Sequence, residues 1–129
     1  MKIGILYIAL GAYSVMWQEF YDSAKQYFLN KDEKHFFVFT DDKFIKESEE
    51  IRVIKTQNYG WPGNTLYRFR MFSSISEELE SFDYLFFFNA NALFVKNIDE
   101  DILPKDNCEL VSVQHFAYEN CHPAFLQKK

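Results

Sequence analysis

The stretch KIGILYIAL, residues 2–10, is apolar along almost its whole length. Such a run is typical of a strand buried on both faces of a sheet. The residues after it place one apolar face at helical spacing, formed by Trp17, Phe20, Tyr21, Ala24 and Phe28. The start MKIGILYIALGAYS also resembles a short signal peptide, with one lysine before an apolar run. We favour the strand, because the following helix needs a sheet against which to pack.

Further apolar stretches of strand length recur along the chain, at residues 35–40, 51–56, 83–89 and 109–114. Between the third and fourth strands, NYGWPGN predicts a loop that ends at Asn64, a residue able to cap a helix. The apolar face predicted for that helix consists of Leu66, Phe69, Phe72, Ile75 and Leu79. Strands that alternate with helices predict an α/β fold, with a largely parallel sheet and helices on its faces.

Composition excludes several classes of function. The chain has 129 residues, 48% of them hydrophobic and 19% aromatic, which indicates a globular domain with a substantial core. Its net charge of −5 and the lack of a basic stripe argue against nucleic-acid binding. The sequence contains neither GxGxxG nor GxxxxGK[ST], so a nicotinamide dehydrogenase or a P-loop NTPase is disfavoured. Cys108 and Cys121 lack the spacing of zinc ligands, and no apolar run is long enough to span a membrane.

Two asparagines follow the fourth predicted strand, Asn89 and Asn91, with Ala90 between them. If the strand stays extended here, both amides point to the same face and form a grip for a ligand. The alternative is a plain turn, because asparagine favours turns and tolerates left-handed backbone. Spacing alone leaves both interpretations open. Asp41 and Asp42 end the second strand, and we interpret them as turn or cap residues.

Five blocks, taken together in this order and spacing, resemble a known family. They are IALGAY (8–13), FVFTD (37–41), YGWPGNTLYRFRMFSSI (59–75), DYLFFFNAN (83–91) and FAYE (116–119). The set is similar to glycosyltransferase family 6, the retaining α-1,3-galactosyl- and N-acetylgalactosaminyltransferases that include the histo-blood group A and B enzymes. The resemblance implies the Rossmann-like GT-A fold and a UDP-sugar donor.

The resemblance also implies roles for individual residues. Tyr13 matches the tyrosine that stacks on uracil, although a tyrosine at this turn could also be part of the core rim. Trp61 falls in a mobile loop over the donor, or alternatively anchors a turn as a surface aromatic. Residues two apart on a helix do not share a face, so only one of Arg68 and Arg70 is expected to point inward, and the resemblance implies that Arg68 binds the donor. The alternative is that both arginines are solvated. The remaining implied donor-site residues are Ile8, Ala9, Leu10, Asn89, Ala90 and Asn91.

The chain departs from the family's animal members at one motif. Those members carry Asp-x-Asp, which holds a manganese ion against the donor diphosphate, where this chain has Asn89-Ala90-Asn91. Amides are weak ligands for hard cations, but they can donate hydrogen bonds that a carboxylate cannot. The resemblance is therefore to the bacterial branch, and we expect no divalent metal and no other cofactor.

The family's catalytic domain is about twice as long as these residues. We therefore expect residues 1–129 to be the donor-nucleotide-binding part, inactive alone, with the acceptor site and the catalytic nucleophile elsewhere. The implied reaction moves N-acetylgalactosamine or galactose from UDP to a β-galactoside, such as a fucosylated oligosaccharide of the H-antigen type. A cytoplasmic protein without a membrane segment is expected. The alternative is a non-catalytic UDP-sugar-binding or interaction domain that lost Asp-x-Asp.

Overall fold

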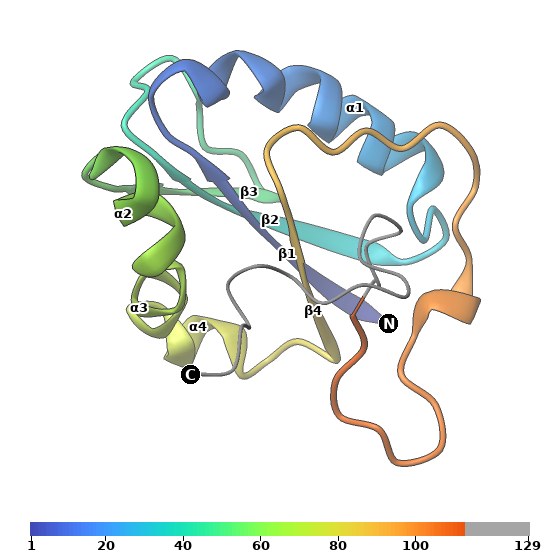
Figure 1. Ribbon diagram of the computed structural model, residues 1–129. Helices are drawn as coiled ribbons and strands as arrows, with labels where there is room; N and C mark the ends of the chain where they lie inside the picture. The colour runs from blue at the N-terminus through green and yellow to red at the C-terminus, as the bar shows by residue number, and fades with distance from the viewer. Residues whose placement is uncertain (113–129) are drawn as a thin grey trace, which may run out of the picture. The chain divides into compact units, whose positions relative to one another are not determined.

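The computed structural model describes residues 1–112 (Figure 1). The chain divides into two compact units, Met1–Asp99 and Glu100–Lys129. The first unit contains β1 (Lys2–Ala9), η1 (Gly11–Met16), α1 (Trp17–Tyr27), β2 (Glu33–Thr40), β3 (Ile51–Lys55), α2 (Gly60–Leu66), α3 (Arg68–Ser73), α4 (Ser76–Leu79) and β4 (Tyr84–Phe88). The described part of the second unit contains the short η2 (Glu100–Ile102).

The four strands form one sheet in the order β3-β2-β1-β4, and every pairing is parallel. The central strand β1 therefore pairs with β2 on one side and with β4 on the other. In register, Ala9 lies opposite Thr40, and Tyr7 lies opposite Phe88. The carboxyl ends of β1, β2 and β4 thus meet at one edge of the sheet. The parallel α/β sheet predicted from the sequence is confirmed, and so is the strand predicted for residues 2–10, which forms β1 within the sheet.

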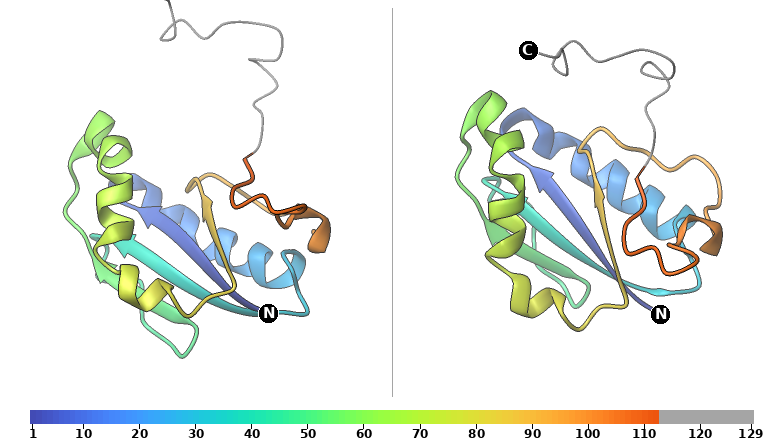
Figure 2. Two further views of the ribbon diagram at one scale, coloured as in Figure 1. Left: turned by 90° about the horizontal axis from the view of Figure 1, so that it is seen from below. Right: turned by 60° about the horizontal axis from the view of Figure 1, so that its bottom comes forward.

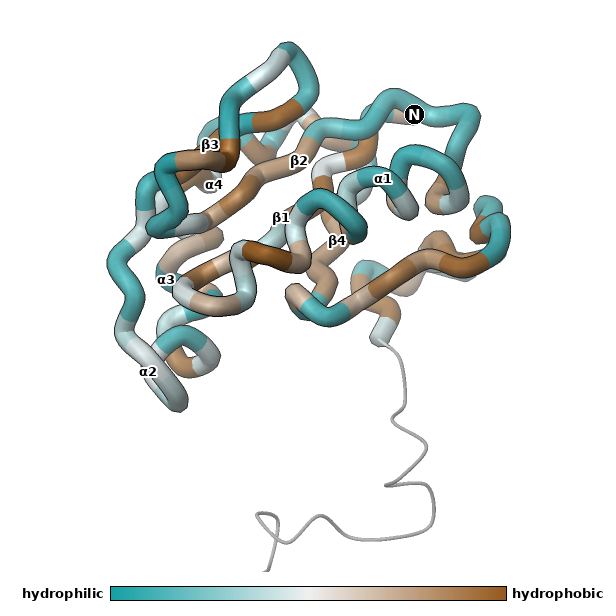
Figure 3. Tube along the Cα trace, turned by 90° about the horizontal axis from the view of Figure 1, so that it is seen from above, coloured by the Kyte–Doolittle hydropathy of each residue, from teal (hydrophilic) through white to brown (hydrophobic). Residues whose placement is uncertain are grey.

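Helices cover both faces of the sheet, as Figure 2 shows, with α1 on one face and the run α2–α4 on the other. Figure 3 shows hydrophobic residues along β1 and β2. Both strands are covered on their two faces, so they need apolar residues at most positions. Helix α1 buries the predicted face against the sheet, with Trp17, Phe20 and Ala24 at most 6% exposed. The opposite core contains Leu6, Leu10, Phe37, Phe39, Met71, Ile75 and Leu79.

The helix predicted to begin at Asn64 is the main error in the predicted elements. Asn64 lies inside α2, where its side-chain oxygen accepts a hydrogen bond from the Tyr59 amide at 2.9 Å. Its own amide group donates to Asn58 Oδ1, so Asn64 closes a loop instead of capping a helix. The expected single face is also broken, because Leu66 and Phe69 are 71% and 75% exposed. Three short helices lie where one was expected. After each break the next helix points a different set of residues toward the sheet.

The fifth predicted strand, 109–114, is not present where the structure describes it. Residues 109–112 have no regular structure, and the last two positions lie outside the described residues. Cys108 is exposed and makes no disulfide among the described residues. The block at 116–119 and Cys121 also lie outside them. No helix in the described part of the chain is both long enough and apolar enough to cross a membrane.

Candidate functional site at the carboxyl edge of the sheet

The carboxyl ends of β1 and β4 bring two of the predicted groups together. In a parallel sheet, ligands bind beyond the carboxyl ends of the strands. Ile8 lies near the end of β1, where it packs against the core beside α3, and Tyr13 follows in η1. The Asn89–Asn91 segment follows β4, whose last residue pairs with Tyr7. The register therefore places the two asparagines beside the end of β1.

The end of β1 presents one exposed ring. Ala9 and Leu10 are 0% and 2% exposed over the whole residue, so neither offers a ligand an accessible surface. The Ala9 carbonyl already accepts a hydrogen bond of 2.6 Å from the Thr40 hydroxyl. Tyr13 is 56% exposed. Its ring is therefore not part of the core and is free to serve as a stacking platform.

The turn that carries Tyr13 is held by the neighbouring loops. Gly11 has a φ of +59°, which glycine adopts without strain. A Cβ at this position would lie 2.8 Å from Asn58 Nδ2, so the loop after β3 approaches closely. The Gly11 amide donates to Asp41 Oδ1 at 2.9 Å, which confirms the structural role predicted for Asp41. Asn58 was not predicted as a site residue, because its local signal in the sequence is no more than its place in a turn-rich segment.

The two asparagines lie in a turn and not in an extended strand. Strand β4 ends at Phe88, and the Ala92 amide donates to the Asn89 carbonyl at 3.0 Å. The condition for the same-face geometry is therefore not met, because pleating no longer directs the two amides. Both asparagine side chains are nevertheless exposed at the edge. The Ala90 carbonyl accepts a hydrogen bond of 2.8 Å from the Tyr7 hydroxyl, which secures the middle of the turn.

Arg68 and Arg70 differ as the helical spacing predicts. The Arg68 guanidinium lies 4.3 Å from the centre of the Phe87 ring, on the face of the sheet covered by α3. Its Nε is buried and finds no hydrogen-bond partner within residues 1–112, and burial lowers its pKa. Arg70 is exposed, 5.0 Å from the Tyr67 ring. Only Arg68 therefore points inward, although it makes no hydrogen bond to either asparagine among the described contacts.

The profile of glycosyltransferase family 6 matches residues 1–126. The chain belongs to this family. It is 37% identical over 122 residues to the O-antigen biosynthesis glycosyltransferase WbnI of Escherichia coli. That match covers 93% of this chain and 51% of the relative, so the chain spans about half the length of that protein. The parallel sheet with flanking helices agrees with the GT-A fold that the family resemblance implied.

Three remaining predictions concern Trp61, Asp42 and the absence of a metal ion. Trp61 is 90% exposed in α2, so it packs too little to anchor a turn, and its placement over a donor stays a prediction. Asp42 accepts a hydrogen bond from the Phe44 amide at 2.8 Å, an Asx-type turn that fits its predicted structural role. Among residues 1–112, no three His, Cys, Asp or Glu side chains gather where they could hold a metal ion. Metal independence itself stays a prediction.

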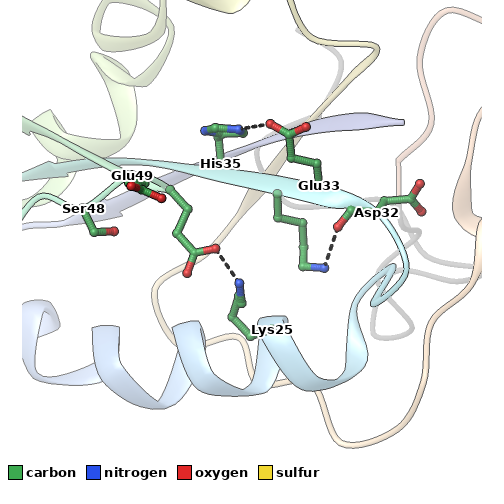
Figure 4. Close-up of a pocket in the computed structure, with 8 residues that line it drawn as sticks. Lys25, Asp32, Glu33, His35, Ser48 and Glu49 are labelled. Atoms are coloured by element: carbon green, nitrogen blue, oxygen red, sulfur yellow. Dashed lines mark hydrogen bonds and ion pairs between the residues drawn. The ribbon is translucent and has the colours of Figure 1, made fainter.

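A polar pocket of ≈ 580 Å³ lies elsewhere, at the amino end of β2 (Figure 4). Two pairs form among its lining side chains: Glu50 accepts a hydrogen bond from Lys25, and His35 pairs with Glu33. Glu50 also accepts a hydrogen bond from the Tyr21 hydroxyl, outside the lining. Strand β2 has eight residues, so this pocket is about 20 Å from the carboxyl edge. It does not belong to the candidate site.

Proposed function

We propose that the whole protein is a retaining α-1,3-glycosyltransferase. It transfers N-acetylgalactosamine or galactose from a UDP donor to a β-galactoside hydroxyl, without a divalent metal. Membership of glycosyltransferase family 6 supports the reaction class. The Escherichia coli relative is named for O-antigen biosynthesis, which supports a carbohydrate acceptor. A fucosylated H-antigen-type glycan is the acceptor that the family resemblance favours.

The observation that carries this proposal is the Asn89–Ala92 turn at the carboxyl end of β4, beside the end of β1. Ligands of an open parallel sheet bind at this edge. The family resemblance implies that the uracil lies beside Tyr13, after the end of β1. An exposed amide is both a donor and an acceptor of hydrogen bonds. Asn89 and Asn91 can therefore bind donor oxygens directly, at the place where animal family members use a manganese ion.

The leaving diphosphate develops negative charge, and without a metal another group must stabilise it. Arg68 is the candidate, since its guanidinium is partly desolvated and its buried Nε–H has no partner among the described residues. A guanidinium also matches the planar geometry of phosphate oxygens. Tyr13 would stack on the uracil, and Trp61 would close over the donor from α2.

The test is a donor screen on the whole protein with a β-galactoside acceptor, in the presence of excess EDTA. We expect transfer from UDP-N-acetylgalactosamine or UDP-galactose, and an α-1,3 linkage in the product with the donor's anomeric configuration retained. Binding of UDP-sugars by calorimetry without any transfer would favour the alternative, a non-catalytic UDP-sugar-binding domain. Binding with no preference for uridine would contradict both.

A further inference from the structure

Tyr7 is a buried tyrosine whose hydroxyl ends at the candidate site. It lies in the central strand β1, is 0% exposed, and stacks on Phe20 of α1 at 4.3 Å between ring centres. Its hydroxyl donates to the Ala90 carbonyl at 2.8 Å. Strand register explains this reach, because Tyr7 lies opposite Phe88 and Ala90 follows two residues later. A core tyrosine on one strand thus contacts the loop that leaves the next strand.

The chain beyond the turn is anchored to the same face of the sheet. After β4 it crosses α1, as Figure 1 shows in the gold and orange segment. Phe94 packs against Phe20 and Phe88, and its amide donates to the buried Ser23 hydroxyl at 3.2 Å. The turn of residues 89–92 is therefore fixed at both ends, by β4 and by Phe94. Between these anchors, the Tyr7 hydroxyl is the side-chain group among residues 1–112 that donates a hydrogen bond to the turn.

We propose that Tyr7 is a positioning residue that sets the geometry of Asn89 and Asn91 for the donor. The inference rests on the proposed function, since it assigns those amides to donor binding. Their side chains are exposed, so packing does not orient them, and their direction follows the backbone of the turn. A hydrogen bond at Ala90, the residue between them, restrains the peptide planes on which both are carried. Tyr7 does this without touching the donor.

Replacing Tyr7 with phenylalanine removes one oxygen atom and keeps the ring in the aromatic cluster. Loss of one hydrogen bond of ordinary net strength corresponds to about a three- to tenfold change in an equilibrium constant. We expect the dissociation constant and KM for the UDP-sugar to rise by about this factor. We expect kcat and the acceptor KM to change less than about twofold, because the acceptor and the reacting groups do not depend on Ala90.

Tyr21 provides a matched control. It is a tyrosine of α1 in the same aromatic cluster, 5.4 Å from Trp17, and its hydroxyl donates to Glu50. Burial raises the pKa of both Tyr7 and Tyr21 to about 12, so both hydroxyls stay protonated at any assay pH below that value. Tyr21→Phe therefore removes a tyrosine hydroxyl away from the Asn turn, one that donates to a carboxylate and not to a backbone carbonyl. It should also lower stability, while leaving the donor KM unchanged.

The experiment compares the whole wild-type protein with the two variants by calorimetry with UDP-sugar, by initial-rate kinetics and by amide exchange. In Tyr7→Phe, the Ala92 amide that closes the turn should exchange faster, while amides of β1 keep their rates. Equal donor KM values for Tyr7→Phe and Tyr21→Phe would overturn the inference. If Tyr7→Phe does not fold, the wild type still tests the contact, because a rapidly exchanging Tyr7 hydroxyl proton would contradict it. A wild type that binds no UDP-sugar would instead refute the proposed function, whatever the exchange of Ala92 shows.

Discussion

Replacing Arg68 with methionine separates a binding role from a folding role. Methionine keeps a long, flexible side chain over the Phe87 ring but removes the charge and the N–H groups. Two opposing terms then act on stability. Loss of the contact between guanidinium and ring, 4.3 Å from the ring centre, costs roughly 0.5–2 kcal/mol. Removing a buried Nε–H that has no partner among the described residues returns roughly 1–3 kcal/mol.

Because these terms oppose each other, the free energy of unfolding should change by between a loss of about 1 kcal/mol and a gain of about 2.5 kcal/mol. Activity should respond differently. A hydrogen bond from a charged donor contributes about 1.5–3 kcal/mol, which corresponds to a loss of roughly 10- to 100-fold in kcat/KM. Arg68→Lys should recover only part of this loss, because lysine lacks the two-pronged geometry of the guanidinium.

The assay is kcat/KM for the UDP-sugar in the whole protein, paired with urea unfolding of the same samples. Arg70→Met is the matched control, because Arg70 is exposed on the same helix and should change kcat/KM less than about threefold. Equal small losses in the two variants would show that neither arginine contacts the donor. A large drop in stability for Arg68→Met alone would show that Arg68 supports the fold.

Three further predictions concern other residues. Tyr13→Ala should weaken UDP binding by about 1–3 kcal/mol, the usual contribution of stacking, with little loss of stability from a half-exposed ring; unchanged affinity in calorimetry would contradict the stacking role. For Glu50, burial raises the pKa but the hydrogen bonds from Lys25 and Tyr21 outweigh it, so the net pKa lies below its ordinary 4.5. Ionised Glu50 therefore stabilises the fold above pH 4.5 and loses this effect as the pH falls further, so wild type and Glu50→Gln should converge in stability during acid titration. Activity in excess EDTA should equal activity with manganese, and the double variant Asn89→Asp/Asn91→Asp should bind the donor more weakly through repulsion of the diphosphate. A preparation that is silent in EDTA and restored by manganese would refute metal independence.

The strands were predictable because each is a short apolar run, and burial on both faces leaves little else to fit such a run. Their ends were less so. Strand β2 begins at Glu33, two residues before its predicted start. The two added residues, Glu33 and Lys34, are charged, which argued against a strand. Lys34 is nevertheless only 5% exposed, and its ammonium donates a hydrogen bond to the Leu29 carbonyl at 2.9 Å. A lysine satisfied by a backbone carbonyl can lie in a strand that its charge would seem to exclude.

The prediction of one continuous helix after Asn64 was wrong for a different reason. The spacing of Leu66, Phe69 and Phe72 is correct for one continuous helix, but Tyr67 interrupts it with non-helical backbone. Met71 then takes the buried position, and Phe69 turns outward. A periodic pattern carries no information about such a break unless glycine or proline marks it. Helical periodicity therefore predicted that helices occur here, but not which residues they bury.

The candidate site shows where local patterns end. That asparagines follow an apolar strand was visible in the sequence, and so was the choice between a grip and a turn. The structure contains the turn, but the two amides can still bind a ligand, because both remain exposed at the edge where a donor would bind. The turn does change what orients the two side chains. In a strand, pleating would align Asn89 with Asn91, whereas in a turn their direction depends on contacts from elsewhere. The hydroxyl of Tyr7 lies 83 residues from Ala90 in the chain, so the spacing Asn-x-Asn alone does not specify the geometry of this pair.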